Sequence, residues 1–117
     1  MKDFRKSTKR NKNIEKVRKM RHSSRWKRTS ELIRLKFHMK CQNPSKCPKM
    51  AESVHHIKPA AAFPQLFFDE YNLIPLCDDC HEKLGKLQGA ERDELQRQWK
   101  QILDKRTDEQ GDNNYFS

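Results

Sequence analysis

Residues 77–81 read CDDCH, a stretch that holds two cysteines, two acids and one histidine within five positions. From Asp78 onward the sequence DDCHEKLGKLQ predicts a helix, because its acids occupy the first turn, where the helix dipole favours negative charge. Gly89 is expected to end that helix. The cysteine pair is therefore placed at a helix start, with His81 in its first turn.

A second cysteine pair precedes the first by about thirty residues, in the loop sequence MKCQNPSKCPKM. Two such pairs, one in a knuckle loop and one at a helix start, can surround Zn²⁺ tetrahedrally with four thiolates. The alternative is four unrelated buried thiols. Only 33% of positions are hydrophobic, so the core must be small and a closed structural zinc would contribute folding free energy. The predicted zinc ligands are Cys41, Cys47, Cys77 and Cys80.

Two adjacent histidines stand in the sequence VHHIKP at residues 54–59. Neighbouring residues of a regular strand point to opposite faces, so His55 and His56 are not expected to share one task. The stretches MAESVHHI and NLIPLC predict two short strands, joined by the long loop AAAFPQLFFDEY into a hairpin. Strand, loop, strand and helix in this order predict that His55, His56 and His81 meet, in a ββα unit around a metal.

VHHIKP, Asn72 in YNLIPLC, and CDDCH together resemble the HNH nuclease motif of the His-Me finger superfamily in its zinc-stapled, four-cysteine form, over about residues 24–88. The resemblance implies a small α+β protein. Its core would be a ββα-metal, treble-clef-like unit with a four-cysteine structural zinc site and flanking N- and C-terminal helices.

The resemblance also implies a role for each site residue. His55 and His81 would hold a catalytic divalent ion such as Mg²⁺, Mn²⁺ or Ni²⁺, His56 would be the general base, and Asn72 would brace the loop and orient that base. These roles suit phosphodiester hydrolysis, because a neutral imidazole can accept a proton from water. An ion held by two protein ligands keeps positions open for water and phosphate oxygens.

The positive charge is concentrated at the N-terminus. Residues 1–28 contain thirteen Lys or Arg and two acids, a charge of +11 in a chain whose net charge is +10. With few apolar residues, residues 1–23 are predicted to form a basic arm that is flexible or only partly helical when free. Its expected partner is double-stranded DNA, which it would bind through phosphates, and the alternative is a solvated tail. The DNA-binding candidates are Arg25, Lys27, Arg28 and Lys58.

Helical patterns flank the motif. The sequence SSRWKRTSELIRLKF, with an apolar stripe of Trp26, Ile33 and Phe37, predicts a helix capped by Ser23 or Ser24. A second amphipathic helix is predicted in AERDELQRQWKQILDKR. The domain organisation is therefore a basic arm (1–23), an HNH endonuclease domain (24–106) and a disordered tail (107–117).

Three functions are compatible with these features. The first is an HNH endonuclease that cleaves DNA, and the second is a non-catalytic zinc-knuckle DNA-binding or packaging accessory protein. The third is a structural adaptor that binds protein through its C-terminal helix. Similarity to small phage-encoded HNH endonucleases found near terminase genes implies a link to DNA packaging and a terminase subunit as partner. Without a signal peptide or an apolar run of spanning length, we expect no membrane association and the cytoplasm of a bacterial or phage-infected host cell.

Overall fold

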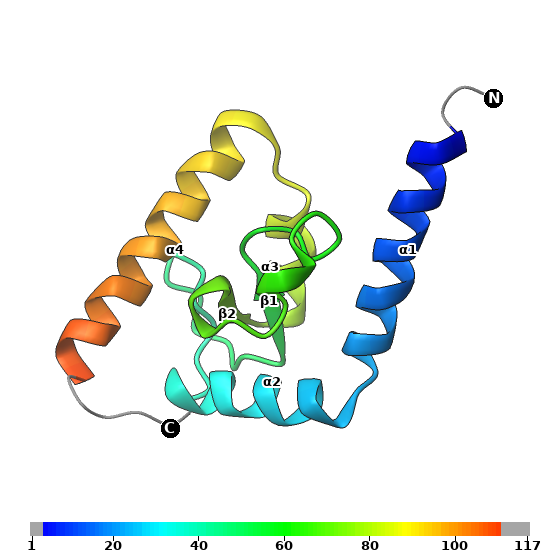
Figure 1. Ribbon diagram of the computed structural model, residues 1–117. Coiled ribbons are helices and arrows are strands. Elements are labelled where there is room, and N and C mark those ends of the chain that lie inside the picture. The colour runs from blue at the N-terminus through cyan, green and yellow to red at the C-terminus, as the bar shows by residue number, and fades with distance from the viewer. Residues whose placement is uncertain (1–3, 111–117) are drawn as a thin grey trace.

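The computed structural model describes the backbone of residues 4–110 and the side chains of residues 12–105 (Figure 1). Two long helices, α1 and α4, stand on opposite sides of a central hairpin, and α2 runs beneath it. Two short 3-10 helices lie in the loop between the strands. The elements are α1 (Phe4–Arg21), α2 (Ser24–Lys36), β1 (Ser53–His56), β2 (Leu73–Leu76), α3 (Asp78–Gly85) and α4 (Gly89–Gln110).

The central hairpin pairs β1 and β2 in antiparallel register, with His55 opposite Ile74 and His56 opposite Leu73. All four residues of β2 are buried, because helices cover both faces of this small sheet. The observed α+β architecture, with a knuckle loop, a hairpin and a helix that begins at Cys77, confirms the predicted fold class.

Helix α2 forms as its sequence pattern predicts. The Ser23 side chain caps its start by accepting a hydrogen bond from the Trp26 backbone N–H at 3.1 Å. Ile33 and Phe37 are buried against the hairpin, together with Leu95, Trp99 and Leu103 of α4. In addition, the Trp99 indole N–H donates to the Gln42 carbonyl at 2.9 Å, which fastens α4 to the knuckle loop.

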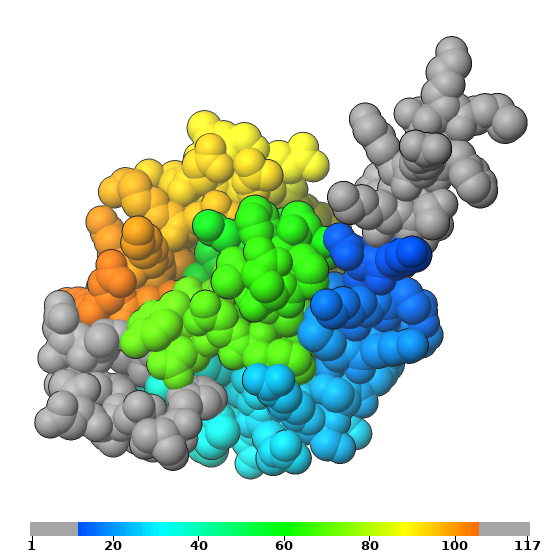
Figure 2. All heavy atoms as spheres, in the orientation of Figure 1, coloured from blue at the N-terminus to red at the C-terminus, as the bar shows by residue number. Residues whose placement is uncertain are grey.

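The N-terminal arm differs from its prediction. Its residues form α1, and the C-terminal part of this helix packs against the loop between the strands (Figure 2). Val17 is buried with Ala60 and Phe67, and the Asn13 side-chain amide donates to the Ala61 carbonyl at 3.4 Å. The arm was predicted to be flexible or only partly helical when free, whereas its residues Phe4–Arg21 are helical throughout. The arm has few apolar side chains, but the loop supplies them with a partner that composition could not reveal.

Two helix ends also differ from prediction. Helix α3 ends at Gly85, and Gly89 instead begins α4, with a φ of 63° that favours glycine. Helix α4 continues to Gln110, because no glycine or proline interrupts it before Gly111. The first four residues of the predicted disordered tail are thus helical, and residues 111–117 lie outside the described residues. Among residues 4–110, no helix is long and apolar enough to cross a membrane.

Candidate active site and metal site

The four predicted zinc ligands lie together. The sulfur atoms of Cys41, Cys47, Cys77 and Cys80 are all within 4.8 Å of one another, and those of Cys47 and Cys77 are 3.9 Å apart. Tetrahedral binding with metal–sulfur bonds of about 2.3 Å places sulfurs about 3.8 Å apart. The cluster therefore fits a four-thiolate metal site, and it fills all four positions of a tetrahedral ion. Among the side chains of residues 12–105, no other group of three or more histidines, cysteines or acids is arranged in this way.

Local backbone geometry builds the cysteine cluster. Left-handed φ angles at His38, Met39 and Lys46 turn the chain after α2 and before the second cysteine of the knuckle. The Asn43 amide donates to the Cys80 sulfur at 3.2 Å, a contact that also favours a thiolate. Burial raises the pKa of the Cys80 thiol to about 12, so metal binding must displace this proton and should weaken in acid.

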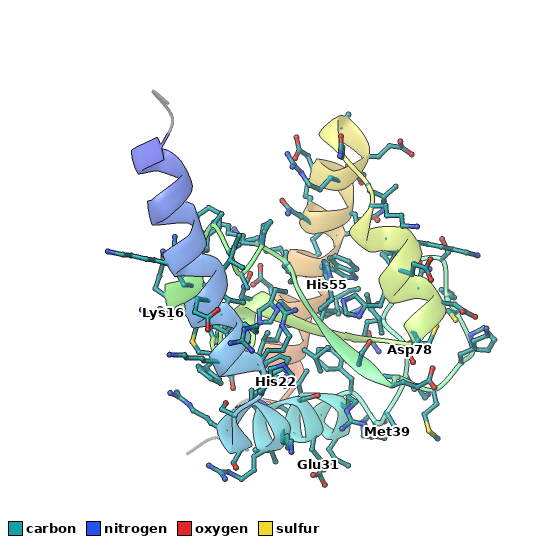
Figure 3. The ribbon with its side chains drawn as sticks, turned by 90° about the vertical axis from the view of Figure 1, so that its right-hand side faces the viewer. Lys16, His22, Glu31, Met39, His55 and Asp78 are labelled. Carbon is teal, nitrogen blue, oxygen red and sulfur yellow. The ribbon has the colours of Figure 1, made fainter. Side chains whose placement is uncertain are left out.

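His55 and His81 form a pair on one side of the hairpin. Their ring centroids are 5.2 Å apart and their planes are nearly perpendicular, at 80°. His55 points into the interior of the molecule, whereas Glu31 points outward from α2 (Figure 3). His81 comes from the first turn of α3, one residue after Cys80, so the cysteine cluster fixes its position relative to β1.

Hydrogen bonds through Ser53 determine which nitrogen of His81 is free. The Ser53 oxygen lies 3.3 Å from the Leu76 carbonyl and 2.9 Å from His81 Nδ1, and both hydrogen bonds form when the hydroxyl donates to the carbonyl and accepts from Nδ1–H. In this arrangement Nδ1 of His81 carries the proton. In the neutral ring, Nε2 is then left with a lone pair that can bind a metal.

His56 has a different environment from its neighbour. It stacks on Trp26 with ring centroids 5.1 Å apart, and its Nε2 lies 3.1 Å from the Phe67 carbonyl oxygen. Because a carbonyl can only accept, Nε2 carries the proton, and Nδ1 of the neutral ring is the basic nitrogen. The two adjacent histidines are thus held by different parts of the fold.

One cavity of about 470 Å³ is nevertheless lined by all three predicted histidines. It lies where β1, the start of the following loop, α3 and the facing ends of α1 and α2 meet. The other lining residues are Arg21, Trp26, Ser30, Glu52, Ser53, Val54, Pro59 and Ala60. The structure thus brings together His55, His56 and His81 from two separate elements.

All three imidazoles favour the neutral form. Burial, with smaller effects of the His81 and His56 rings, lowers the pKa of His55 to about 4. Burial also lowers the pKa of His56 to about 4, against the opposing effect of the Phe67 carbonyl. The pKa of His81 is lowered as well, again chiefly by burial. Near neutral pH each ring therefore keeps a nitrogen lone pair for a cation or a proton.

Asn72 is buried and clamps the loop between the strands. Its Oδ1 accepts from the Lys58 backbone N–H at 2.8 Å, and its Nδ2 donates to the carbonyls of Lys58 and Leu66 at 3.3 Å each. Leu66 is next to Phe67, whose carbonyl accepts from His56. Asn72 therefore braces the segment that holds His56 and has no direct hydrogen bond to the ring among the described residues.

The four DNA-binding candidates are close in sequence to two residues that line this cavity, Trp26 and Pro59. Arg25 and Lys27 flank Trp26 on α2, and Arg28 is exposed one residue further on. The Arg25 guanidinium lies 4.0 Å from the centre of the Phe68 ring, and Lys58 is exposed. All four candidates leave their charged groups accessible to a polyanion.

Sequence reasoning missed three contributors to the site. Trp26 was predicted as core, yet it also stacks on His56. Ser53 could have been found, since it precedes His55 by two residues and so shares its face of the strand. Arg21 could not, because only the packing of α1 brings it to the cavity.

Comparison with known proteins agrees with this geometry. A family model described as HNH endonuclease matches residues 39–87. Among solved structures, the HNH endonuclease of the deep-sea thermophilic bacteriophage GVE2, crystallised with manganese ion, is similar at 30% identity and a TM-score of 0.62. The match covers 67% of this chain and 87% of the phage protein. The chain belongs to the HNH endonuclease family. No curated protein matches it.

Membership of the HNH endonuclease family supports a nuclease that acts on DNA. The matched residues 39–87 contain the cysteine cluster, the hairpin and the three histidines of the cavity. They do not contain α1 or α2, which supply Arg21, Trp26 and Ser30 to the same cavity.

Proposed function

We propose that this HNH protein is a metal-dependent endonuclease that hydrolyses phosphodiester bonds of double-stranded DNA. The observation that carries the proposal is the cavity lined by three neutral imidazoles, of which His55 and His81 are paired and His56 is held apart. The alternative, a non-catalytic DNA-binding or packaging accessory protein with the same fold, would have no need of a buried base beside a pair of metal ligands.

His55 and Nε2 of His81 would hold the catalytic divalent ion. Two neutral imidazoles are suitable ligands for Mn²⁺ or Ni²⁺, and Mg²⁺ would rely more on water and phosphate oxygens. The manganese ion in the similar phage endonuclease supports a divalent ion here. When bound, such an ion would stabilise negative charge on the phosphate and on the leaving oxygen. Because the chain supplies only two imidazoles, most coordination positions would remain for water and DNA.

His56 would act as the general base. Its Nε2 is engaged by the Phe67 carbonyl, so Nδ1 would accept the proton of the attacking water. Stacking on Trp26 fixes the plane of the ring. Asn72 would support this arrangement indirectly, through the loop backbone that ends at Phe67.

The four-cysteine cluster would hold a structural zinc ion. Four thiolates favour Zn²⁺, and a closed site leaves no position for substrate. By linking the knuckle loop to the start of α3, this ion would fix His81 opposite His55. The cluster would thus contribute to catalysis only by holding the histidines in place.

The most direct test of the nuclease is nicking of supercoiled plasmid DNA by the purified full chain. We expect conversion to open-circle or linear DNA with Mn²⁺, Mg²⁺ or Ni²⁺ and none without a divalent ion. DNA binding without cleavage under every one of these ions would favour the accessory protein instead. A pull-down with phage terminase subunits would test the proposed packaging link separately.

DNA affinity should fall steeply with salt, because the proposed contacts of Arg25, Lys27, Arg28 and Lys58 neutralise phosphates without reading bases. Each phosphate contact contributes about 0.9 to the slope of log K against log salt. Removing Lys27 and Arg28 together by alanine substitution should therefore lower the slope by about 2. Fluorescence anisotropy with a labelled duplex at 50–200 mM salt would measure it.

A control for the salt experiment is Lys105→Ala, which removes an exposed charge near the end of α4. This variant should keep the wild-type slope. A slope near zero for the wild type, or equal slopes for the double variant and the wild type, would contradict phosphate binding by α2.

Ser53 gives a test of the metal site that does not depend on cleavage. Its oxygen accepts from His81 Nδ1 and thereby leaves Nε2 free, so Ser53→Ala should weaken Mn²⁺ binding about 10- to 100-fold. Ser53→Thr keeps the hydroxyl and should bind Mn²⁺ nearly as well as the wild type. Titration of the zinc-loaded protein by electron paramagnetic resonance would measure free Mn²⁺. Equal Mn²⁺ affinity of the alanine variant and the wild type would contradict ligation by Nε2 of His81.

A further inference from the structure

The cavity contains one charged group that none of the proposed roles uses. Among the described residues that line it, the only lysine or arginine is Arg21, the last residue of α1, and the only carboxylate is that of Glu52. The Glu52 carboxylate accepts from the Asp78 backbone N–H at 3.2 Å, at the start of α3. Among the described residues, the ion pairs of the chain do not include Arg21, so its charge is uncompensated by a bonded acid.

Packing of α1 directs Arg21 to this cavity. Val17 and Met20, on the preceding turns of the helix, pack with Ala60 and Phe67. The Arg21 guanidinium lies 5.9 Å from the centre of the Phe67 ring. The backbone carbonyl of Phe67 accepts a hydrogen bond from His56. The arginine is thus near the base and comes from a helix that residues 39–87 do not include.

The charge of Arg21 already acts on the cavity. It contributes to the lowered pKa of both His56 and His81, after the larger effect of burial. A cation that lines the same cavity as the base and the paired histidines is suited to an anionic substrate group, because phosphodiester hydrolysis adds negative charge to the phosphate in the transition state. Arginine is also the side chain best matched to two phosphate oxygens at once.

We propose that Arg21 is a catalytic residue that binds a non-bridging oxygen of the scissile phosphate and stabilises the charge that develops there. This role rests on the proposed nuclease function. The role of Arg21 makes α1 part of the active site as well as a basic arm. Loss of the contact between Arg21 and the phosphate should slow the cleavage step more than it weakens DNA binding.

The test compares Arg21→Ala with Lys19→Ala, which removes the same charge from an exposed position on the same helix that does not line the cavity. Single-turnover cleavage of a labelled duplex with Mn²⁺ at saturating protein reports the chemical step. Anisotropy with Ca²⁺ reports binding. We expect Arg21→Ala to cleave about 100-fold more slowly than Lys19→Ala, while the two variants bind DNA with similar Kd. Arg21→Lys should recover part of the rate.

Circular dichroism and zinc content would establish that each variant is folded. Saturated cleavage by Arg21→Ala within twofold of Lys19→Ala would overturn the role of Arg21 and leave the nuclease intact, provided that His56→Ala is inactive in the same assay. Absence of cleavage by the wild type with every divalent ion would overturn both proposals.

Discussion

His56→Ala should lose nearly all plasmid nicking while it keeps DNA binding and zinc. General bases contribute about 100- to 10,000-fold to reaction rates, and no second imidazole could replace this one, because His55 and His81 would be occupied by the divalent ion. The measurement is the single-turnover rate with Mn²⁺ at saturating protein. The affinity for a labelled duplex should change little, since the neutral His56 ring carries no charge for phosphate contacts.

A control for His56→Ala is His22→Ala, which removes an exposed imidazole at the turn between α1 and α2. This variant should nick at the wild-type rate. Since His56 is buried against Trp26, His56→Asn provides a second variant with a smaller loss of polar contact. If a folded, zinc-loaded His56 variant nicks as fast as His22→Ala, the base is another group.

Cys77→Ser should prevent the domain from folding. Structural zinc in small domains contributes an apparent free energy of about 10–16 kcal/mol, which exceeds the whole stability of many domains of this size. Cys77 is also the N-cap of α3, and its sulfur accepts from the Cys80 N–H at 3.4 Å. We expect loss of bound zinc, loss of the cooperative thermal transition and loss of nicking together.

A control for the zinc site is Asp79→Ala, between the two cysteines of the CDDCH stretch. Asp79 is exposed and forms a surface ion pair with Lys49, so its removal should change the stability of the domain little. Zinc content by mass spectrometry and unfolding by circular dichroism would separate the two variants. A folded Cys77→Ser protein with a wild-type melting temperature and no zinc would contradict the role of the cluster.

Local signals were enough to predict the parts of the fold that depend on short segments. The Ser23 cap and the apolar spacing predicted α2, and the short strand-like runs MAESVHHI and NLIPLC predicted a hairpin with a long loop. The two cysteine pairs predicted the sulfur cluster, because side-chain chemistry limits what four thiols in this arrangement can bind. These features require little knowledge of long-range packing.

The parts that the sequence did not reveal depend on distant contacts. Composition alone predicted an arm that is flexible or only partly helical when free, whereas Val17 and Met20 pack against residues some forty positions away, in the loop after β1. For the same reason Arg21 could not be assigned to the cavity. The environment of His56, with Trp26 on one side and the Phe67 carbonyl on the other, likewise required the fold.

The division between the adjacent histidines shows how both kinds of information combine. The strand period predicted that His55 and His56 would differ, and their contacts differ as expected: one faces His81 and the other Trp26. What strand geometry could not show is that both residues line the same cavity. The proposed roles of ligand and base depend on that shared cavity.

The central claim is that a four-cysteine cluster holds three imidazoles around one catalytic cation. A crystal structure of the zinc-loaded protein soaked with Mn²⁺, with anomalous scattering recorded at the manganese edge, tests it most directly. We predict a manganese peak bonded to His55 and to Nε2 of His81, with Nδ1 of His56 facing a water molecule near the ion. A manganese peak elsewhere, with His55 and His81 free of metal, would contradict the account.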